Sequence, residues 1–405
     1  MYGARAANGV ILITTKKGKE GEVKVDYSGS YSYQKYNDSY DVLNLKEWMQ
    51  LRNDATKENW EFVNRVYPYS SKTLEEANEA PVNGIPYKRL YSDEQIRNAG
   101  EGTDWLSLVT RDGMVLQNNL SIRGGTKSTK YFLSGNLFDQ EGIIKNSGLK
   151  RSTVHFSIDQ KLAEIVTVGM NLTKSRIKNQ NSQLGGDQYE NSGIIRSAIQ
   201  QSPAIEAIDE FGNYPINPDN ALEPNPYSLL TISDEGIVDR TLMNFYGEVK
   251  PFKGFTARVQ GGFDQGNTSR STYLPRTTLY GALENGKASI NTQKKDDDLL
   301  DIILTYNTKL GDDHSFTIMG GYSQQTFRTE TSSLGNSNFI TDAFLWNNMN
   351  AGAGTKVTGS SKYEYGYRSY FSRLNYSYKD KYMLTSSIRR DGSSSYAKNN
   401  KYSLF

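Results

Sequence analysis

Apolar and polar residues alternate without a break from Glu22 to Gln34. One face carries valine, glycine and tyrosine, and the other carries lysine, aspartate, serine and glutamine. Because successive side chains of a strand point to opposite faces, this pattern predicts a strand with one apolar and one polar surface. It is longer than the roughly 5–6 residues usual in soluble proteins, and it reaches the about 9–11 residues that a tilted membrane strand needs. Alone, it fits either a membrane strand or the outer strand of a soluble sandwich.

Further segments repeat this alternation, with apolar residues at every second position. Arg123, Asp159 and Arg373 are among the polar residues on their opposite faces. The sequence therefore predicts about 11 strands whose two faces differ in polarity. The later ten predicted strands are 114–124, 128–139, 151–160, 165–177, 239–250, 255–265, 298–309, 314–327, 365–378 and 381–390.

The connections between these strands are alternately long and short. The long ones are 35–113, 140–150, 178–238, 266–297 and 328–364; the short ones are 125–127, 161–164, 251–254, 311–313 and 379–380. Short turns at one end and long loops at the other are typical of outer-membrane barrels, whereas a soluble sandwich mixes both lengths at both ends. The predicted fold is all-β: a partial antiparallel transmembrane β-barrel with long, helix-containing extracellular loops.

The long connections contain helix signals. Asn44 with Glu47, and Ser92 with Gln95, have the spacing of a capping box. An apolar stripe over 194–199 predicts a third helix, which ends before Pro203. The four tryptophans (Trp48, Trp60, Trp105 and Trp346) all lie in connections. Two interpretations stay open for them: packing of the loops on one another, or a surface for a ligand or partner.

Composition narrows the class of protein. Only 36% of the 405 residues are hydrophobic, and no run approaches the about 20 apolar residues of a membrane helix. A barrel remains possible, because only half of each strand must be apolar. The chain has no cysteine, which argues against a disulfide scaffold and a Cys–zinc site. A net charge of +2 gives no case for nucleic acid as a partner.

Residues that could carry chemistry are few. The two histidines, His155 and His314, have no carboxylate or hydroxyl at motif spacing. The charged run 294–298 lacks the spaced oxygens and the glycine of an EF-hand loop, and no helix follows the glycine pairs as a phosphate loop requires. We expect no catalytic residue, no metal, no cofactor and no enzyme activity.

An odd number of strands suggests a partial barrel. Bacterial single-chain barrels have an even number, and an open sheet edge cannot face lipid. No signal peptide follows Met1. We therefore expect these residues to be part of a longer protein.

Two blocks carry a family resemblance. The block Tyr2–Lys17 resembles the end of the plug in SusC/RagA-type TonB-dependent outer-membrane transporters, and Tyr370–Tyr382, continuing to Ser394, resembles a hairpin of their barrel. Gly102–Trp105 and Phe138–Ile144 match the same family. The resemblance implies that residues 1–18 end a plug domain. It also implies that residues 19–405 form the N-terminal half of a barrel of roughly 22 strands.

The resemblance further implies import of oligosaccharides or oligopeptides across the outer membrane, where lipid surrounds the barrel. Its expected partners are a SusD-like surface lipoprotein and TonB, the latter through an N-terminal region outside this chain. The alternative is a surface binding or adhesive β-protein that does not transport. Amphipathic aromatics in external loops can stack on sugars or anchor a partner. The substrate- or partner-facing candidates are Trp105, Tyr189, Tyr214, Tyr227 and Trp346.

Overall fold

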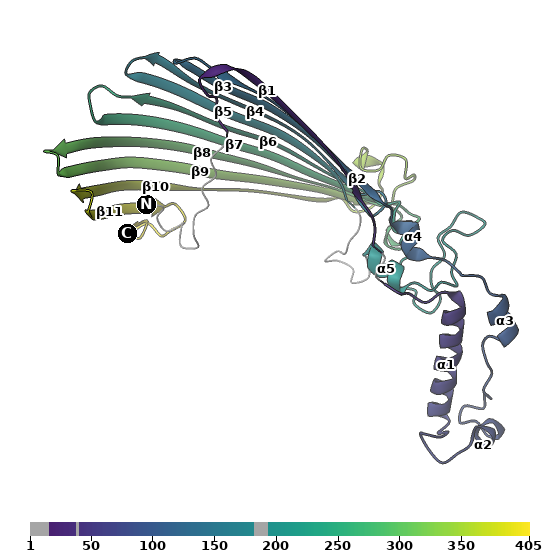
Figure 1. Cartoon of the computed structure of the whole chain (residues 1–405). Coiled ribbons are helices and arrows are strands. Elements are labelled where there is room, and N and C mark those ends of the chain that lie inside the picture. Colours follow the sequence, from purple (N-terminus) through teal and green to yellow (C-terminus); the bar gives the residue numbers. More distant parts are fainter. Residues whose placement is uncertain (1–15, 38–39, 182–192) are drawn as a thin grey trace.

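The computed structural model describes residues 16–37, 40–181 and 193–405. Within these ranges, twelve strands form one antiparallel sheet in which each strand pairs with its neighbours in sequence (Figure 1). The sheet curves into an open arc, which is a partial β-barrel. The strands are β1 (Gly21–Gln34), β2 (Gly113–Gly125), β3 (Thr129–Glu141), β4 (Gly148–Ala163), β5 (Val166–Gln180), β6 (Ser233–Val249), β7 (Phe255–Leu274), β8 (Lys287–Leu310), β9 (His314–Ser337), β10 (Val357–Tyr378), β11 (Tyr382–Ser393) and β12 (Tyr402–Leu404).

All eleven predicted strands are present, and the short β12 returns to pair with β11. The predicted long connections 266–297 and 328–364 were wrong in their extent, because β8 and β9 each run for 24 residues. Their extensions carry polar side chains on both faces, so the apolar alternation stops although the ladder of paired residues continues. The sequence pattern therefore marked only the part of each strand that has an apolar face.

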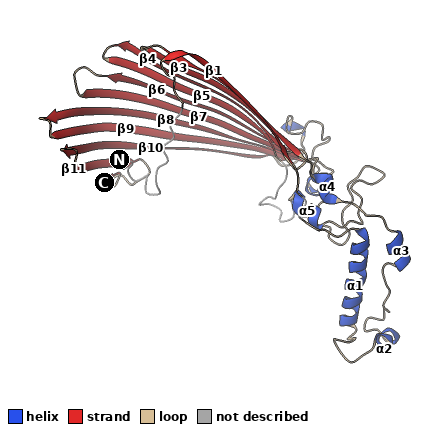
Figure 2. Cartoon of the chain, viewed as in Figure 1, coloured by secondary structure: helices blue, strands red, loops and turns tan. Residues whose placement is uncertain are grey.

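Short turns gather at one end of the sheet, and the helices and long loops gather at the other (Figure 2). This confirms the predicted alternation of connections. The turn between β6 and β7 shows why some of these positions need glycine: Gly254 has a φ of 87°. A Cβ at this residue would also meet the carbonyl oxygen of Asn307 at 2.2 Å. Any other side chain at this turn would strain the backbone.

Helices occupy the loops where capping signals predicted them. Asn44 accepts a hydrogen bond from the Glu47 amide, and the Glu47 carboxylate accepts one from the Asn44 amide, both at 3.0 Å. Ser92 and Gln95 form the same reciprocal pair. No helix in the described ranges is long and apolar enough to span a membrane. The helices are α1 (Leu45–Val63), α2 (Leu74–Glu79), α3 (Asp93–Asn98), α4 (Trp105–Val109), α5 (Ile194–Gln200), α6 (Pro226–Leu229), α7 (Leu279–Leu283) and the short 3-10 helix η2 (Met349–Ala351).

Strand register joins the apolar residues into one continuous face. Leu304 lies beside Ala257 and Gly320, and Ile302 lies beside Val259 and Tyr322. Leu304 is 46% exposed, and residues like it line the whole face. Soluble monomers rarely expose contiguous apolar patches larger than a few hundred Å². This apolar belt therefore requires an apolar environment, whereas the opposite, inner face is polar.

Candidate functional site

Several charged residues on the inner face are paired across neighbouring strands. The Arg270 guanidinium makes two parallel bonds to the Asp234 carboxylate, from Nε at 3.0 Å and from Nη2 at 2.6 Å. Arg240 binds Asp264 through the same two nitrogens. Such forked pairs fix the side chains geometrically. The inner wall is therefore a preorganised polar surface along which a hydrophilic solute or protein segment can lie.

A compact group near the short-turn end joins this wall to the chain before β1. The Tyr246 hydroxyl donates to Asp159 Oδ1 at 2.6 Å, and the Arg258 guanidinium lies 3.9 Å from the centre of the Tyr246 ring. The ring crosses Gly169, where a Cβ would meet it at 2.3 Å. The Lys17 ammonium lies 3.8 Å from Asp159 Oδ2. The segment leading into β1 therefore contacts the inner face.

An aromatic cluster on the inner face of β9 and β10 escaped the sequence analysis. The Phe327 and Tyr365 rings stack 4.7 Å apart, and Tyr363 and Tyr367 flank Tyr365 at 5.2 and 5.7 Å. Tyr363, Tyr365 and Tyr367 alternate in the opposite phase to the apolar-belt residue Tyr370. This opposite phase could have indicated an aromatic group on the inner face. The predicted strand began at residue 365 and so left out Tyr363.

The helices α4, α5 and α6 pack together around Trp105. Its indole is 3% exposed, and its Nε1 donates to the carbonyl of Ser202 at 2.9 Å. Ile144, from the loop between β3 and β4, joins the same cluster. Trp105 therefore occupies the position of a core residue that holds three long loops together.

The other candidate aromatics lie in separate places. The Tyr214 and Tyr227 rings are 6.3 Å apart, and Tyr227 packs half-buried against the Trp105 cluster. Burial raises the pKa of the Tyr214 phenol. Trp346 packs half-buried against a second cluster, which contains Tyr273, Ala288 and Phe339. Tyr189 lies outside the described residues.

Neither histidine lies in a cluster of metal ligands. His155 Nδ1 is 2.8 Å from the Thr173 hydroxyl, and His314 Nδ1 is 2.8 Å from the Tyr376 hydroxyl. Over the described part of the chain, no group of three His, Cys, Asp or Glu residues could hold a metal ion. The histidine contacts are pairwise hydrogen bonds between neighbouring strands.

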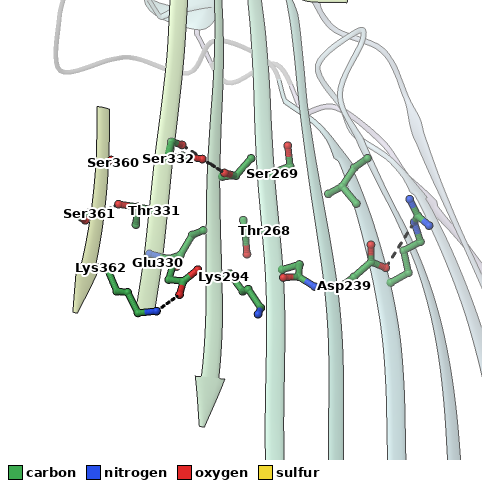
Figure 3. Close-up of a pocket in the computed structure, with 15 residues that line it drawn as sticks. Asp239, Thr268, Ser269, Lys294, Glu330, Thr331, Ser332, Ser360, Ser361 and Lys362 are labelled. Carbon is green, nitrogen blue, oxygen red and sulfur yellow. Dashed lines mark hydrogen bonds and ion pairs between the residues drawn. The ribbon is translucent and has the colours of Figure 1, made fainter. Parts of the chain in front are cut away.

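A groove of about 870 Å³ crosses the strand extensions from β5 to β10 (Figure 3). The Arg176–Asp239 and Lys362–Glu330 ion pairs line it, at 3.7 and 2.7 Å. Lys294 also lines it, and it shares a face with Leu304, since their positions along β8 differ by an even number. The charged side chains of the groove therefore face outward, beyond the apolar belt.

Glu223 is a buried acid beneath the loop helices. It is 2% exposed, and its Oε1 has no hydrogen-bond partner among the described residues. Burial raises the pKa of the Glu223 carboxyl, although a hydrogen bond to Ser197 and the charge of Arg196 oppose that rise. A charged carboxylate in this place costs free energy that a neutral group avoids.

Glu223→Gln is expected to stabilise the loop cluster by about 1 kcal/mol at pH 8. The pKa of Glu223 is higher in the folded state than in the unfolded state, where it is about 4.3. The wild type therefore loses stability as the pH rises above about 4.3. The gain should therefore shrink towards pH 4, where most of the glutamate is protonated in both states. Thermal midpoints followed by tryptophan fluorescence at both pH values test this. An equal gain at pH 4 and pH 8 would contradict it.

No family model matches the chain, but individual known proteins match it over its whole length. The chain is 32% identical, over 100% of its length, to TonB-dependent receptor P3 of Formosa agariphila, of which it covers 37%. It is 27% identical to TonB-dependent receptor SusC of Bacteroides thetaiotaomicron, of which it covers 38%. The chain thus spans little more than a third of these relatives.

A solved structure shares the fold of the whole chain. The structure of the RagAB peptide transporter superposes on all of it with a TM-score of 0.77 at 21% identity. The chain covers 46% of that transporter chain. The curved meander, with its long loops at one end, is therefore a known architecture.

Proposed function

From the similarity of this whole chain to SusC/RagA-type TonB-dependent transporters, we propose that it forms part of an outer-membrane transporter for oligomeric nutrients. The observation that carries the proposal is the sheet itself, with its apolar outer belt, its paired polar inner wall and its long loops at one end. An apolar belt suits lipid, and a polar inner wall suits a hydrophilic solute. Import energised by TonB is the activity that we propose.

We assign residues 1–18 to the end of a plug domain and residues 19–405 to the N-terminal half of the barrel. The predicted final strand of that plug, 9–17, lies outside the described residues up to residue 15, and residues 16 and 17 are not part of a strand. The contact of Lys17 with Asp159 supports the assignment, because it brings the chain before β1 against the inner wall. Short turns then face the periplasm, and long loops face the exterior.

The loop end is the proposed place of capture. A SusD-like lipoprotein would cover the helix-bearing loops there, and glycans or peptides would pass beneath it. Tyr214, Tyr227 and Trp346 are the proposed substrate- or partner-facing aromatics, because each keeps part of its ring accessible. The described position of Trp105 instead supports a role in holding those loops.

Deleting the gene is expected to abolish growth on one polymeric nutrient, and the wild-type gene should restore it. Collapsing the proton gradient should stop uptake while surface binding persists, because TonB depends on that gradient. Complementation with Tyr214→Ala/Tyr227→Ala should slow uptake, whereas Phe252→Ala, an aromatic substitution at the opposite end, should not. If deletion of the gene left the uptake of every tested glycan and peptide unchanged, the proposed transport function would be contradicted. That result would favour a binding or adhesive protein.

A further inference from the structure

Four cations cluster on the outward face of β4 and β5. They are Lys150, Lys174, Arg176 and Lys178. The three on β5 share a face with Leu172, because their positions along the strand differ from it by even numbers. Leu172 lies in the apolar belt between Phe156 and Met243. The cations therefore begin where the belt ends, on its long-loop side.

The cluster borders an outward-facing hollow of about 440 Å³. Its lining includes Leu116 and Leu137 together with Lys150, Arg176 and Lys178. Leu116 and Leu137 are 47% and 62% exposed. An accessible apolar floor beneath a cationic rim matches a molecule that has an apolar chain and an anionic head.

Three of these cations form ion pairs with carboxylates on the neighbouring strands, and in each pair the cation is the more exposed partner. Lys150 pairs with Asp139, Arg176 with Asp239 and Lys178 with Glu235, at 3.1, 3.7 and 2.6 Å. In these pairs the cationic side chains are 73%, 62% and 54% exposed, against 44%, 38% and 31% for their carboxylates. Exposed ion pairs are weak. The cations therefore remain available to a second anion.

The register adds a repulsion that an anion would relieve. Lys150 lies directly opposite Lys178 on the same face, and like charges in this position destabilise a strand pair. Lys174 lies opposite the neutral residues Val154 and Thr241. An anion above the two strands would therefore interact favourably with several cations at once.

We propose that this outward hollow binds the phosphate-bearing headgroup of a membrane lipid, with an acyl chain against Leu116 and Leu137. The phosphate lies among Lys150, Arg176 and Lys178, which line the hollow. This site is separate from the transport path on the inner face. It rests on the proposed membrane location and not on import, so loss of lipid binding and loss of uptake are independent results.

The strand extensions of β8–β10 provide a matched control. Lys294, Arg328 and Lys362 share the outward face, but four carboxylates accompany these three cations. The acids are Asp296, Asp298, Glu330 and Glu364. Removing cations there changes the net charge equally without touching the proposed hollow.

The experiment compares lipid binding to the delipidated, detergent-purified protein by native mass spectrometry. Titration with phosphatidylglycerol is expected to give one tightly bound lipid, and phosphatidylcholine a weaker one. Near a membrane surface, each cation contributes about fivefold to binding of an anionic lipid. Lys174→Gln/Arg176→Gln/Lys178→Gln should therefore weaken phosphatidylglycerol binding at least about tenfold. Lys294→Gln/Arg328→Gln/Lys362→Gln should leave it within about twofold.

Two further arms separate a lipid from a free anion. Leu137→Ser should weaken binding of the lipid and leave the affinity of the protein for inorganic phosphate unchanged. Heat-dependent gel mobility identifies folded variants. If the triple variant does not fold, Lys178→Gln alone tests the site, because Lys178 lines the hollow. Equal losses in the two triple variants would overturn the proposal. So would displacement by inorganic phosphate at concentrations equal to those of the lipid.

Discussion

Leu304→Lys is expected to lower the stability of the membrane-inserted sheet by about 2–4 kcal/mol. Leu304 is 46% exposed and lies midway along the apolar part of β8. Its paired neighbours, Ala257 and Gly320, offer the ammonium no acceptor side chain. In a lipid environment the charge would have to remain in the acyl region or draw water into it.

The adjacent residue supplies the control. Thr305 points to the inner face, where its paired neighbours Thr256 and Met319 are neutral, so Thr305→Lys should change stability by less than about 1 kcal/mol. Urea titration of folding into lipid vesicles, followed by heat-dependent gel mobility, measures both variants. Similar losses for the two substitutions would show that the two faces of β8 do not differ in environment.

Trp105→Ala is expected to destabilise the loop cluster by about 3–5 kcal/mol. The substitution removes a buried indole and its hydrogen bond to the Ser202 carbonyl. Helices α4, α5 and α6 would lose their common contact, while the strand ladder would keep its pairing. Hydrogen exchange of residues 193–232 should rise strongly, and gel mobility of the folded sheet should stay unchanged.

Trp105→Phe separates packing from hydrogen bonding. The phenyl ring retains most of the buried volume and lacks the N–H donor, so a smaller loss of about 1–2 kcal/mol is expected. Protection of 193–232 should therefore fall in the order wild type, Trp105→Phe, Trp105→Ala. Unchanged protection in Trp105→Ala would mean that the loops are held by other contacts.

Eleven of the twelve described strands, with their directions, were predictable because each of the eleven has one apolar face. The segment from Glu22 and the segment around Leu304 both show a period of two, and the structure confirms both. The upper part of β8, from Lys287 to Asp298, carries polar residues on both faces. This part is a strand because its backbone pairs with β7 and β9. The alternation of polar and apolar residues gives no information about that pairing. The capping boxes were readable because their hydrogen bonds join residues close in sequence.

The candidate site was less predictable, because it depends on contacts between distant segments. The sequence identified Trp105 as a loop aromatic, but only the structure places Ser202 and Ile144 against it. The inner cluster around Tyr365 was not predicted, because its stacking partner Phe327 comes from another strand. The family resemblance is confirmed, and it came from continuous blocks of residues rather than from spatial clusters.

The strictly sequential strand order has a consequence for how the sheet assembles. Closing a loop costs about 0.6 kcal/mol more for each doubling of its length. Joining β2 to β3 closes three residues, whereas joining β1 to β2 closes the long segment 35–112. The entropic difference is about 3 kcal/mol. Hairpins with short turns, such as β2–β3 and β8–β9, should therefore form first, and their later association is the slow part of folding.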